Sequence, residues 1–190
     1  PGCYGKLSPA QASPEIARTV AAQGGEHGPV SLAKAWKEMG HRYLAGILGL
    51  LIFAIALLAW WRRESRLLAT LALAVVAFQA TLGMWTVTLL LRPAIVTAHL
   101  LGGMTMLALL VWLALEQWPH SPAPSLRVPA VLGLAAVSVQ IALGGWVSAN
   151  YAGLACVDFP TCHGDWAPAM DFGHGFHFFR ELGMTAAGES

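Results

Sequence analysis

Four long apolar segments constrain the fold of this 190-residue chain more than any other feature of its sequence. A bilayer core is about 30 Å thick, so a helix rising about 1.5 Å per residue needs about 20 apolar residues to cross it. None of the four segments contains Lys, Arg, Asp or Glu. They are residues 43–61, 67–91, 93–115 and 128–148. We therefore expect an all-α polytopic membrane protein with four transmembrane helices, the third of which opens at Pro93.

The composition excludes the common soluble classes. The chain is 56% hydrophobic and 11% charged, whereas soluble domains are roughly 45–50% apolar and about 25% charged. Disordered chains combine low hydrophobicity with high net charge, which is the opposite pattern. A net charge of +1 offers no clustered basic surface for DNA or RNA. We therefore expect the lipid bilayer to surround this chain, and we expect no nucleic-acid partner.

The distribution of arginine and cysteine predicts which loops face the cytoplasm. Loop 62–66 holds three arginines, and short loops rich in Lys and Arg stay on the cytoplasmic side. Residues 1–42 and 149–190 then face outward, and they contain all three cysteines. Disulfides form on that oxidising side. We therefore expect a bacterial cytoplasmic membrane with periplasmic Cys loops; the mitochondrial inner membrane is the less favoured alternative.

A short internal repeat predicts a duplicated architecture. The pattern Pro-x-Cys-x-Gly occurs at residues 1–5 and again at residues 160–164, each time in an external loop. A predicted helix and Cys156 precede the second copy, whereas neither precedes the first. We therefore expect this chain to be a fragment of a duplicated bundle of four plus four helices.

This interpretation divides the chain into three parts. Residues 1–42 form an external loop with a helical lead-in to the first span. Residues 43–127 hold the remaining three transmembrane helices of the N-terminal half. Residues 128–190 are the first helix and the external Cys loop of the C-terminal half.

Two histidines lie at membrane depth on different predicted helices. His41 lies at the outer mouth of the first span, in a helix that Ser31 should cap. His99 lies roughly 9 Å into the third span, which runs in the same direction. Ionisable residues inside a membrane are costly and mark functional sites. Two neutral imidazoles at matched depth are typical of axial haem ligation, whereas a single interfacial histidine more often only makes a hydrogen bond.

Small residues accompany both histidines. Ala45 and Gly49 follow His41 on the same helical face, and Gly102 lies one turn after His99. They leave room for a flat macrocycle, but the same pattern is common where membrane helices pack closely. The spacing alone therefore leaves haem binding and helix packing both open.

Two charged residues flank His41. Glu38 precedes it by three residues on the same helical face, where a carboxylate can move a proton or stabilise a cationic intermediate. The alternative is an acidic residue favoured by the early turns of a helix. Arg42 would either bind a haem propionate or extend its guanidinium to the lipid headgroups.

The cysteines favour a disulfide over a metal site. Cys156 and Cys162 are six residues apart, whereas zinc sites use closer pairs and further ligands. The spacing does not decide whether the disulfide is structural or redox-active. Cys3 has no matching partner in this chain, and the repeat places that partner in a preceding segment.

The remaining histidines are expected in loops. His27 and His120 should be solvated. The last external loop holds three histidines around a phenylalanine-rich stretch, residues 172–179, that we expect to lie on the membrane surface. These interfacial histidines are His163, His174 and His177.

Several segments resemble one known family. Residues 38–46, which read Glu-Met-Gly-His-Arg-Tyr-Leu-Ala-Gly, resemble the haem-ligand helix of the haem A synthase family. The other matching segments are residues 83–88, 97–103, 144–151, 156–162 and 176–183. The resemblance covers nearly the whole chain, is least specific over residues 6–33, and is greatest to the proteobacterial and mitochondrial branch.

The resemblance implies an eight-helix protein of two halves, each with a pair of haem-ligating histidines. Such enzymes oxidise the C8 methyl group of haem O to a formyl group, which gives haem A for cytochrome oxidase. In this picture His41 and His99 bind the substrate haem, and Glu38 is the essential carboxylate. The loop cysteines match a disulfide that holds the external loops, and a haem b cofactor is bound by a second pair beyond residue 190.

The family also implies haem O synthase and an electron acceptor as partners, and a homo-oligomer is compatible with it. Two other functions use the same residues differently. A membrane cytochrome b would keep the histidine ligands and only transfer electrons. A thiol–quinone oxidoreductase would act through the external cysteines, with the histidines incidental.

Overall fold

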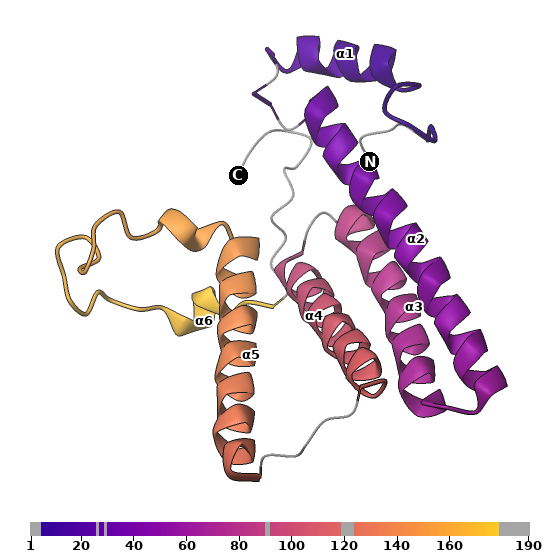
Figure 1. Ribbon diagram of the computed structural model, residues 1–190. Coiled ribbons are helices and arrows are strands. Elements are labelled where there is room, and N and C mark those ends of the chain that lie inside the picture. The colour runs from indigo at the N-terminus through magenta and orange to yellow at the C-terminus, as the bar shows by residue number, and fades with distance from the viewer. Residues whose placement is uncertain (1–4, 26, 29, 90–91, 119–123, 179–190) are drawn as a thin grey trace. The chain divides into compact units, whose positions relative to one another are not determined.

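The computed structural model confirms an all-α protein with four membrane-spanning helices (Figure 1). It describes residues 5–25, 27–28, 30–89, 92–118 and 124–178. The long apolar helices are α2 (Leu32–Arg62), α3 (Arg66–Thr88), α4 (Pro93–Leu115) and α5 (Arg127–Ala149). Across the described ranges the backbone forms no β-strand, and a single isolated bridge joins Cys162 to Asp165. The chain divides into two compact units, Pro1–Arg66 and Leu67–Ser190, and each is described by itself.

Helix α2 begins where its sequence predicts. Ser31 takes an extended conformation, and its hydroxyl accepts a hydrogen bond from the backbone N–H of Lys34 at 3.2 Å. This bond satisfies one of the N–H groups that have no partner within the helix. The side chain of Lys34 donates to the carbonyl of Gly28 at 2.6 Å, which ties the preceding loop to the same turn.

Arginines hold the other end of α2. Arg63 adopts the left-handed conformation, with φ of 65°, and its N–H donates to the carbonyl of Ala59. Arg66 donates from Nη2 to the carbonyl of Trp60 at 3.2 Å, and its guanidinium lies 5.1 Å from the centre of the Trp60 ring. The short loop therefore folds back on the last turn of α2 through charge-assisted and cation–π contacts.

The segment before α2 contains a helix that the sequence patterns did not indicate. Helix α1 (Ser13–Ala22) packs on the start of α2 through a small apolar core of Ala12, Ile16 and Ala35. The signal was weak because only two large apolar side chains, Ile16 and Val20, mark its buried face. Residues 32–42 are helical, as expected for the segment that leads into the first span, and α1 precedes them in the chain.

Helix α3 ends earlier than the predicted limit of 91. Its last residue is Thr88, and the hydroxyls of Thr86 and Thr88 donate to the carbonyls of Gly83 and Met84. β-Branched residues lower helix propensity, and such side-chain bonds compete with the backbone ladder. The predicted span included residues 90–91, which lie outside the described residues.

In the second unit, α4 packs closely against α5. Gly145 of α5 lies so near Leu100 that a Cβ atom there would be 2.7 Å from Leu100 Cδ2. A Cβ atom at the neighbouring Gly144 would meet nothing within 4 Å. Small residues that allow close backbone approach are the usual way for membrane helices to pack.

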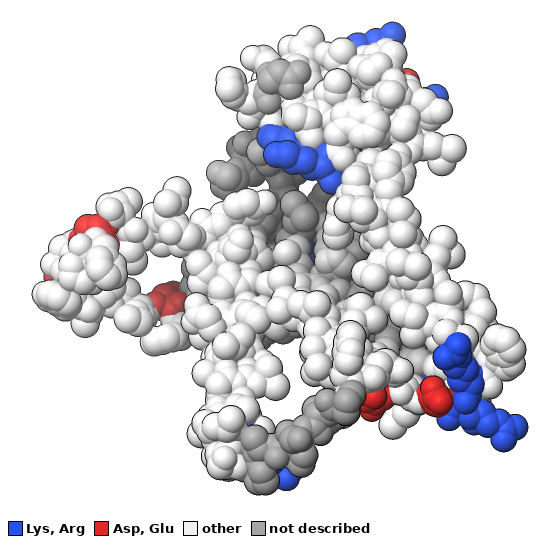
Figure 2. Space-filling model, viewed as in Figure 1, with Lys and Arg blue, Asp and Glu red and all other residues white. Residues whose placement is uncertain are grey.

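Charged side chains concentrate away from the apolar middle of the helices, as a bilayer requires. Figure 2 shows blue and red side chains near helix ends and in loops, with uncharged surface between them. Apolar side chains are exposed along all four long helices, including Ile47, Phe78, Leu107 and Val139. Such a surface would aggregate in water and is stable in lipid.

Replacing Gly145 with valine should destabilise the second unit, because the new side chain would overlap Leu100. Overpacking of this kind costs about 1–3 kcal/mol. The unfolding temperature in detergent should therefore fall in Gly145→Val but much less in the matched control Gly144→Val. Equal effects of the two substitutions would contradict the close contact between α4 and α5.

Candidate functional site

The best-defined part of the candidate site is the contact between α3 and His99 of α4. The Nε2 atom of Gln79 donates a hydrogen bond to the backbone carbonyl of His99 at 2.7 Å. One turn further along α3, Gly83 faces the imidazole ring, and a Cβ atom at Gly83 would lie 3.3 Å from His99 Cε1. The half-buried ring of His99 therefore lies against a position of α3 that has no side chain.

The side chain of Gln79 reaches α4 because of a second glycine. A Cβ atom at Gly102 would be 2.3 Å from Gln79 Oε1 and 2.7 Å from its Cδ. Any larger residue at 102 would displace the carboxamide, so the contact depends on glycine at this position. Gly83 and Gly102 thus shape the two sides of the contact between α3 and His99.

In the first unit, Glu38 and Arg42 form an ion pair. Arg42 Nη2 lies 2.8 Å from Glu38 Oε1, and their side chains are 43% and 35% exposed respectively. Because both groups are partly exposed, the pair contributes little to stability. The ion pair holds the Glu38 carboxylate on the same part of α2 as His41. The side chain of His41 is exposed. In this structure Arg42 pairs with Glu38. The sequence had suggested two other partners for Arg42, a haem propionate or the lipid headgroups.

The surroundings of His41 on α2 are open within its unit. Added Cβ atoms at Gly46 and Gly49 would meet nothing within 4 Å, so this part of α2 can receive a flat ligand. Imidazole nitrogen is a suitable axial donor to haem iron. Taken separately, His41 and His99 each carry an imidazole of the kind that binds haem iron. His41 and His99 belong to different units, so their pairing on one iron stays a prediction.

A groove of about 350 Å³ lies between α4 and α5. It is mostly apolar and partly open to the surroundings. Its lining residues are Val96, Leu100, Gly145, Ser148, Ala149 and Tyr151. The groove lies at the end of α5 that leads into the Cys loop, on the same half of α4 as His99.

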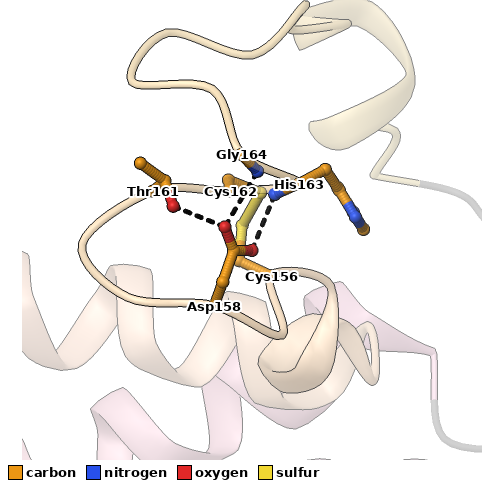
Figure 3. Close-up of a disulfide and its surroundings, with 6 residues drawn as sticks. All are labelled: Cys156, Asp158, Thr161, Cys162, His163 and Gly164. Atoms are coloured by element: carbon orange, nitrogen blue, oxygen red, sulfur yellow. Dashed lines mark hydrogen bonds between the residues drawn. A yellow bond between two sulfur atoms is a disulfide. The ribbon is translucent and has the colours of Figure 1, made fainter.

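The loop after α5 is closed by a disulfide between Cys156 and Cys162, which is the pairing that their spacing favours (Figure 3). No group of three His, Cys, Asp or Glu side chains in the described part of the chain is arranged to hold a metal ion. Cys3 and His120 lie outside the described residues. The predicted partnership of Cys3 is therefore untested.

Asp158 organises the inside of this disulfide loop. Its carboxylate accepts hydrogen bonds from the hydroxyl of Thr161, from the N–H of His163 at 2.7 Å and from the N–H of Gly164 at 2.8 Å. Figure 3 shows the carboxylate between these donors, beside the disulfide. The bonds from Thr161 and Gly164 are the main causes that lower the pKa of Asp158 below its ordinary value, since they favour the charged form.

The far end of the loop returns to α5 (Figure 1). The indole N–H of Trp146 donates to the carbonyl of Gly175 at 2.9 Å. Phe176 stacks on Trp146 with ring centres 6.2 Å apart, and Phe178 packs on it at 5.0 Å. The predicted phenylalanine-rich stretch contains the short helix α6 (Phe172–Gly175), and Phe179 lies outside the described residues. Two short 3-10 turns, η1 (Pro124–Leu126) and η2 (Ala152–Leu154), flank α5.

The sequence patterns indicated neither three residues of this geometry, Gln79, Asp158 and Gly83, nor the ion pair of Glu38 with Arg42. Gln79 is the one amide side chain within α3, and an isolated amide in an apolar span is a usable signal of a partner. Asp158 lies between two cysteines, and aspartate commonly accepts bonds from nearby backbone N–H groups in loops. The ion pair of Glu38 with Arg42 follows the i, i+4 spacing of helical partners. No local sequence pattern indicates that Gly83 makes room for the His99 ring, because this contact involves a residue of another helix, α4.

Comparison with known proteins places these residues in one family. A family model described as cytochrome oxidase assembly protein matches residues 1–185. A protein named heme A synthase from Shewanella oneidensis is 38% identical over 187 residues, covering 95% of this chain and 56% of that protein. Another of that name, from Halalkalibacterium halodurans, is 33% identical over 161 residues, covering 78% of this chain and 54% of its own length.

A third relative, also named heme A synthase, comes from Methylobacterium radiotolerans. It is 36% identical over 148 residues, covering 70% of this chain and 40% of the relative. The chain therefore spans about half the length of the curated relatives it matches. No solved structure matches the chain.

Replacing Asp158 with asparagine should loosen the disulfide loop, because an amide keeps only one acceptor oxygen. Hydrogen exchange at the N–H groups of His163 and Gly164 should become severalfold faster. In the unmodified protein their protection should be full above the ordinary aspartate pKa and should be lost as the pH falls through the lowered pKa of Asp158. The matched control Asp171→Asn changes another loop carboxylate, which accepts a bond from the N–H of His174, and should leave both amides protected. Unchanged exchange in Asp158→Asn would contradict the role of this carboxylate.

Proposed function

Since the chain belongs to the cytochrome oxidase assembly protein family, we propose that the full-length protein is a haem A synthase. It would oxidise the C8 methyl group of haem O to a formyl group. The observation that supports this most directly is the family match over residues 1–185, which contains Glu38, His41 and His99 within the segments that resemble the haem-ligand helices. The geometry around His99 is compatible with a ligand role.

Within this proposal the two imidazoles hold and orient the substrate haem. The macrocycle and its iron supply the redox chemistry when bound. His99 is fixed from the side of α3 by Gln79 and Gly83. His41 is exposed on α2 and free to present a ring nitrogen to a ligand. The protein would therefore act mainly by ligation and orientation.

Glu38 is the residue that we assign to proton transfer. Oxidation of a methyl group to a formyl group with oxygen from water releases protons at the reacting carbon. A carboxylate can accept one of them, or it can stabilise positive charge on that carbon. Arg42 keeps the carboxylate in place at 2.8 Å, on the same helical face as His41. Arg42 remains the proposed partner of a haem propionate when the substrate is bound.

The cellular setting follows the same proposal. We assign the protein to the bacterial cytoplasmic membrane, with the disulfide of Cys156 and Cys162 on the periplasmic side. The proposed cofactor is a haem b bound in the other half of the full-length protein. An electron acceptor must take the electrons from haem O, and haem O synthase is the proposed supplier of substrate. The complete enzyme can also form a homo-oligomer.

Replacing Glu38 with glutamine should abolish haem A formation, because the amide cannot accept the proton. The haem should stay bound, since neither imidazole is changed. Haem extracted from membranes that express the full-length variant should contain haem O and haem b but no haem A, and the optical spectrum should keep its bis-histidine form. The matched control is Glu64→Gln, in the loop after α2.

This experiment also separates the enzyme from an electron-transfer cytochrome b. A cytochrome b would hold haem through the same histidines but would produce no haem A in the unmodified protein. Normal haem A formation by Glu38→Gln would refute the catalytic role of Glu38.

Replacing both Cys156 and Cys162 with serine separates the enzyme from a thiol–quinone oxidoreductase. The disulfide lies in the loop after α5, and the proposed haem ligands lie on α2 and α4. Bound haem O should therefore be retained in the double variant and lost in His99→Ala, as measured by the haem O content of the purified full-length protein, while the haem b content stays unchanged. A protein that works through its cysteines would give the opposite result, with activity lost in the serine variant and preserved in His99→Ala.

A further inference from the structure

The amide of Gln79 is an unusual group to find in a membrane span. Transfer of a carboxamide from water into an apolar phase is unfavourable unless the group forms hydrogen bonds. The bond from Nε2 to the His99 carbonyl offsets part of this cost. Among the described residues the other end of the carboxamide, the buried Oε1, has no hydrogen-bond donor. The contact with His99 is therefore the main polar interaction that keeps Gln79 in this position.

The contact joins Gln79 to the backbone of the residue that would bind iron. The carbonyl of His99 lies on the helical backbone of α4, so a bond to it limits both the rotation of α4 about its axis and its sliding along α3. A single interhelical hydrogen bond contributes little to the stability of a membrane protein, so this one affects the register of the two helices more than their folding.

The same face of α3 also restricts the position of the His99 ring. Gly83 follows Gln79 by one helical turn, and the ring lies against it at a distance that a Cβ atom would crowd, 3.3 Å from Cε1. The hydroxyl of Thr86 donates to the carbonyl of Gly83 at 2.7 Å, which holds this turn of α3. One face of α3 thus contacts the backbone of His99 through Gln79 and its imidazole through Gly83.

We propose that Gln79 is a positioning residue that sets the orientation of the His99 imidazole as a haem ligand. The proposal rests on the proposed function, because it requires His99 to bind iron. Groups that orient a metal-ligating histidine tune the metal, and their loss costs about 10–100-fold in affinity or activity. The orientation of an axial imidazole also affects the electronic state of haem iron, which is measurable without any catalytic turnover.

The experiment replaces Gln79 with methionine in the full-length protein, purified in detergent and loaded with haem O. Methionine has a similar length and no hydrogen-bond donor, so it removes the bond with little change in volume. The matched control is Gln140→Met, which removes an exposed amide from α5. The low-spin ferric signal of this haem is identified in electron paramagnetic resonance as the one that His99→Ala removes.

In Gln79→Met the g-values of that signal should shift and haem A formation should fall about tenfold, while Gln140→Met leaves both unchanged. A second variant, Gly102→Ala, displaces the same carboxamide from the side of α4 and should shift the g-values in the same way. This variant also tests the proposal if Gln79→Met fails to fold. A helix contact that only stabilises the fold would lower the unfolding temperature and leave the g-values unchanged.

Unchanged g-values in both Gln79→Met and Gly102→Ala would overturn the positioning role, even if haem A formation in the unmodified protein upholds the proposed function. If the unmodified protein makes no haem A but the g-values still shift, the proposed function fails and the positioning of His99 stands. If no low-spin signal depends on His99, the ligand assignment and the positioning role fail together.

Discussion

The lack of water in the bilayer core is the constraint on which the rest of this structure depends. Backbone N–H and carbonyl groups must find partners within the same segment, so apolar stretches of this length become continuous helices. Polar side chains are subject to the same requirement: hydroxyls such as those of Thr86 and Thr105 bond to carbonyls of their own helix, and the amide of Gln79 bonds to a neighbouring helix. The bond from Gln79 to the His99 carbonyl is the clearest example. The requirement that shapes the fold thus also restricts the histidine assigned to the iron.

The two candidate haem-binding histidines differ in how many contacts each makes within its own unit. His99 is half-buried, and α3 contacts both its backbone and its ring. His41 is exposed on α2, beside the ion pair of Glu38 and Arg42. Under the proposed function, the haem would therefore be bound by one histidine that a neighbouring helix contacts and by one that is exposed. The proposed proton acceptor, Glu38, lies on the helix of the exposed histidine.

Much of the fold could be predicted because it depends on local sequence. The four spans follow from apolar length, the start of α2 follows from Ser31, and the start of α4 follows from Pro93. The remaining features depend on contacts between segments. Helix α1 is stabilised by packing on α2, and the importance of Gly83 depends on the ring of a residue in another helix. No local sequence pattern shows such contacts. The histidines could therefore be identified from the sequence, whereas the contacts of Gln79 and Gly83 with His99 could not.

Under the proposed function, imidazoles from α2 and α4 would bind the same iron. The direct test is electron paramagnetic resonance of the full-length ferric protein, loaded with haem O, in single variants His41→Ala and His99→Ala. The account predicts that either substitution alone converts the same low-spin haem to a high-spin state, and that His27→Ala, in the loop before α2, leaves it low-spin. If the low-spin signal that disappears in His99→Ala persists in His41→Ala, the two imidazoles do not bind the same iron.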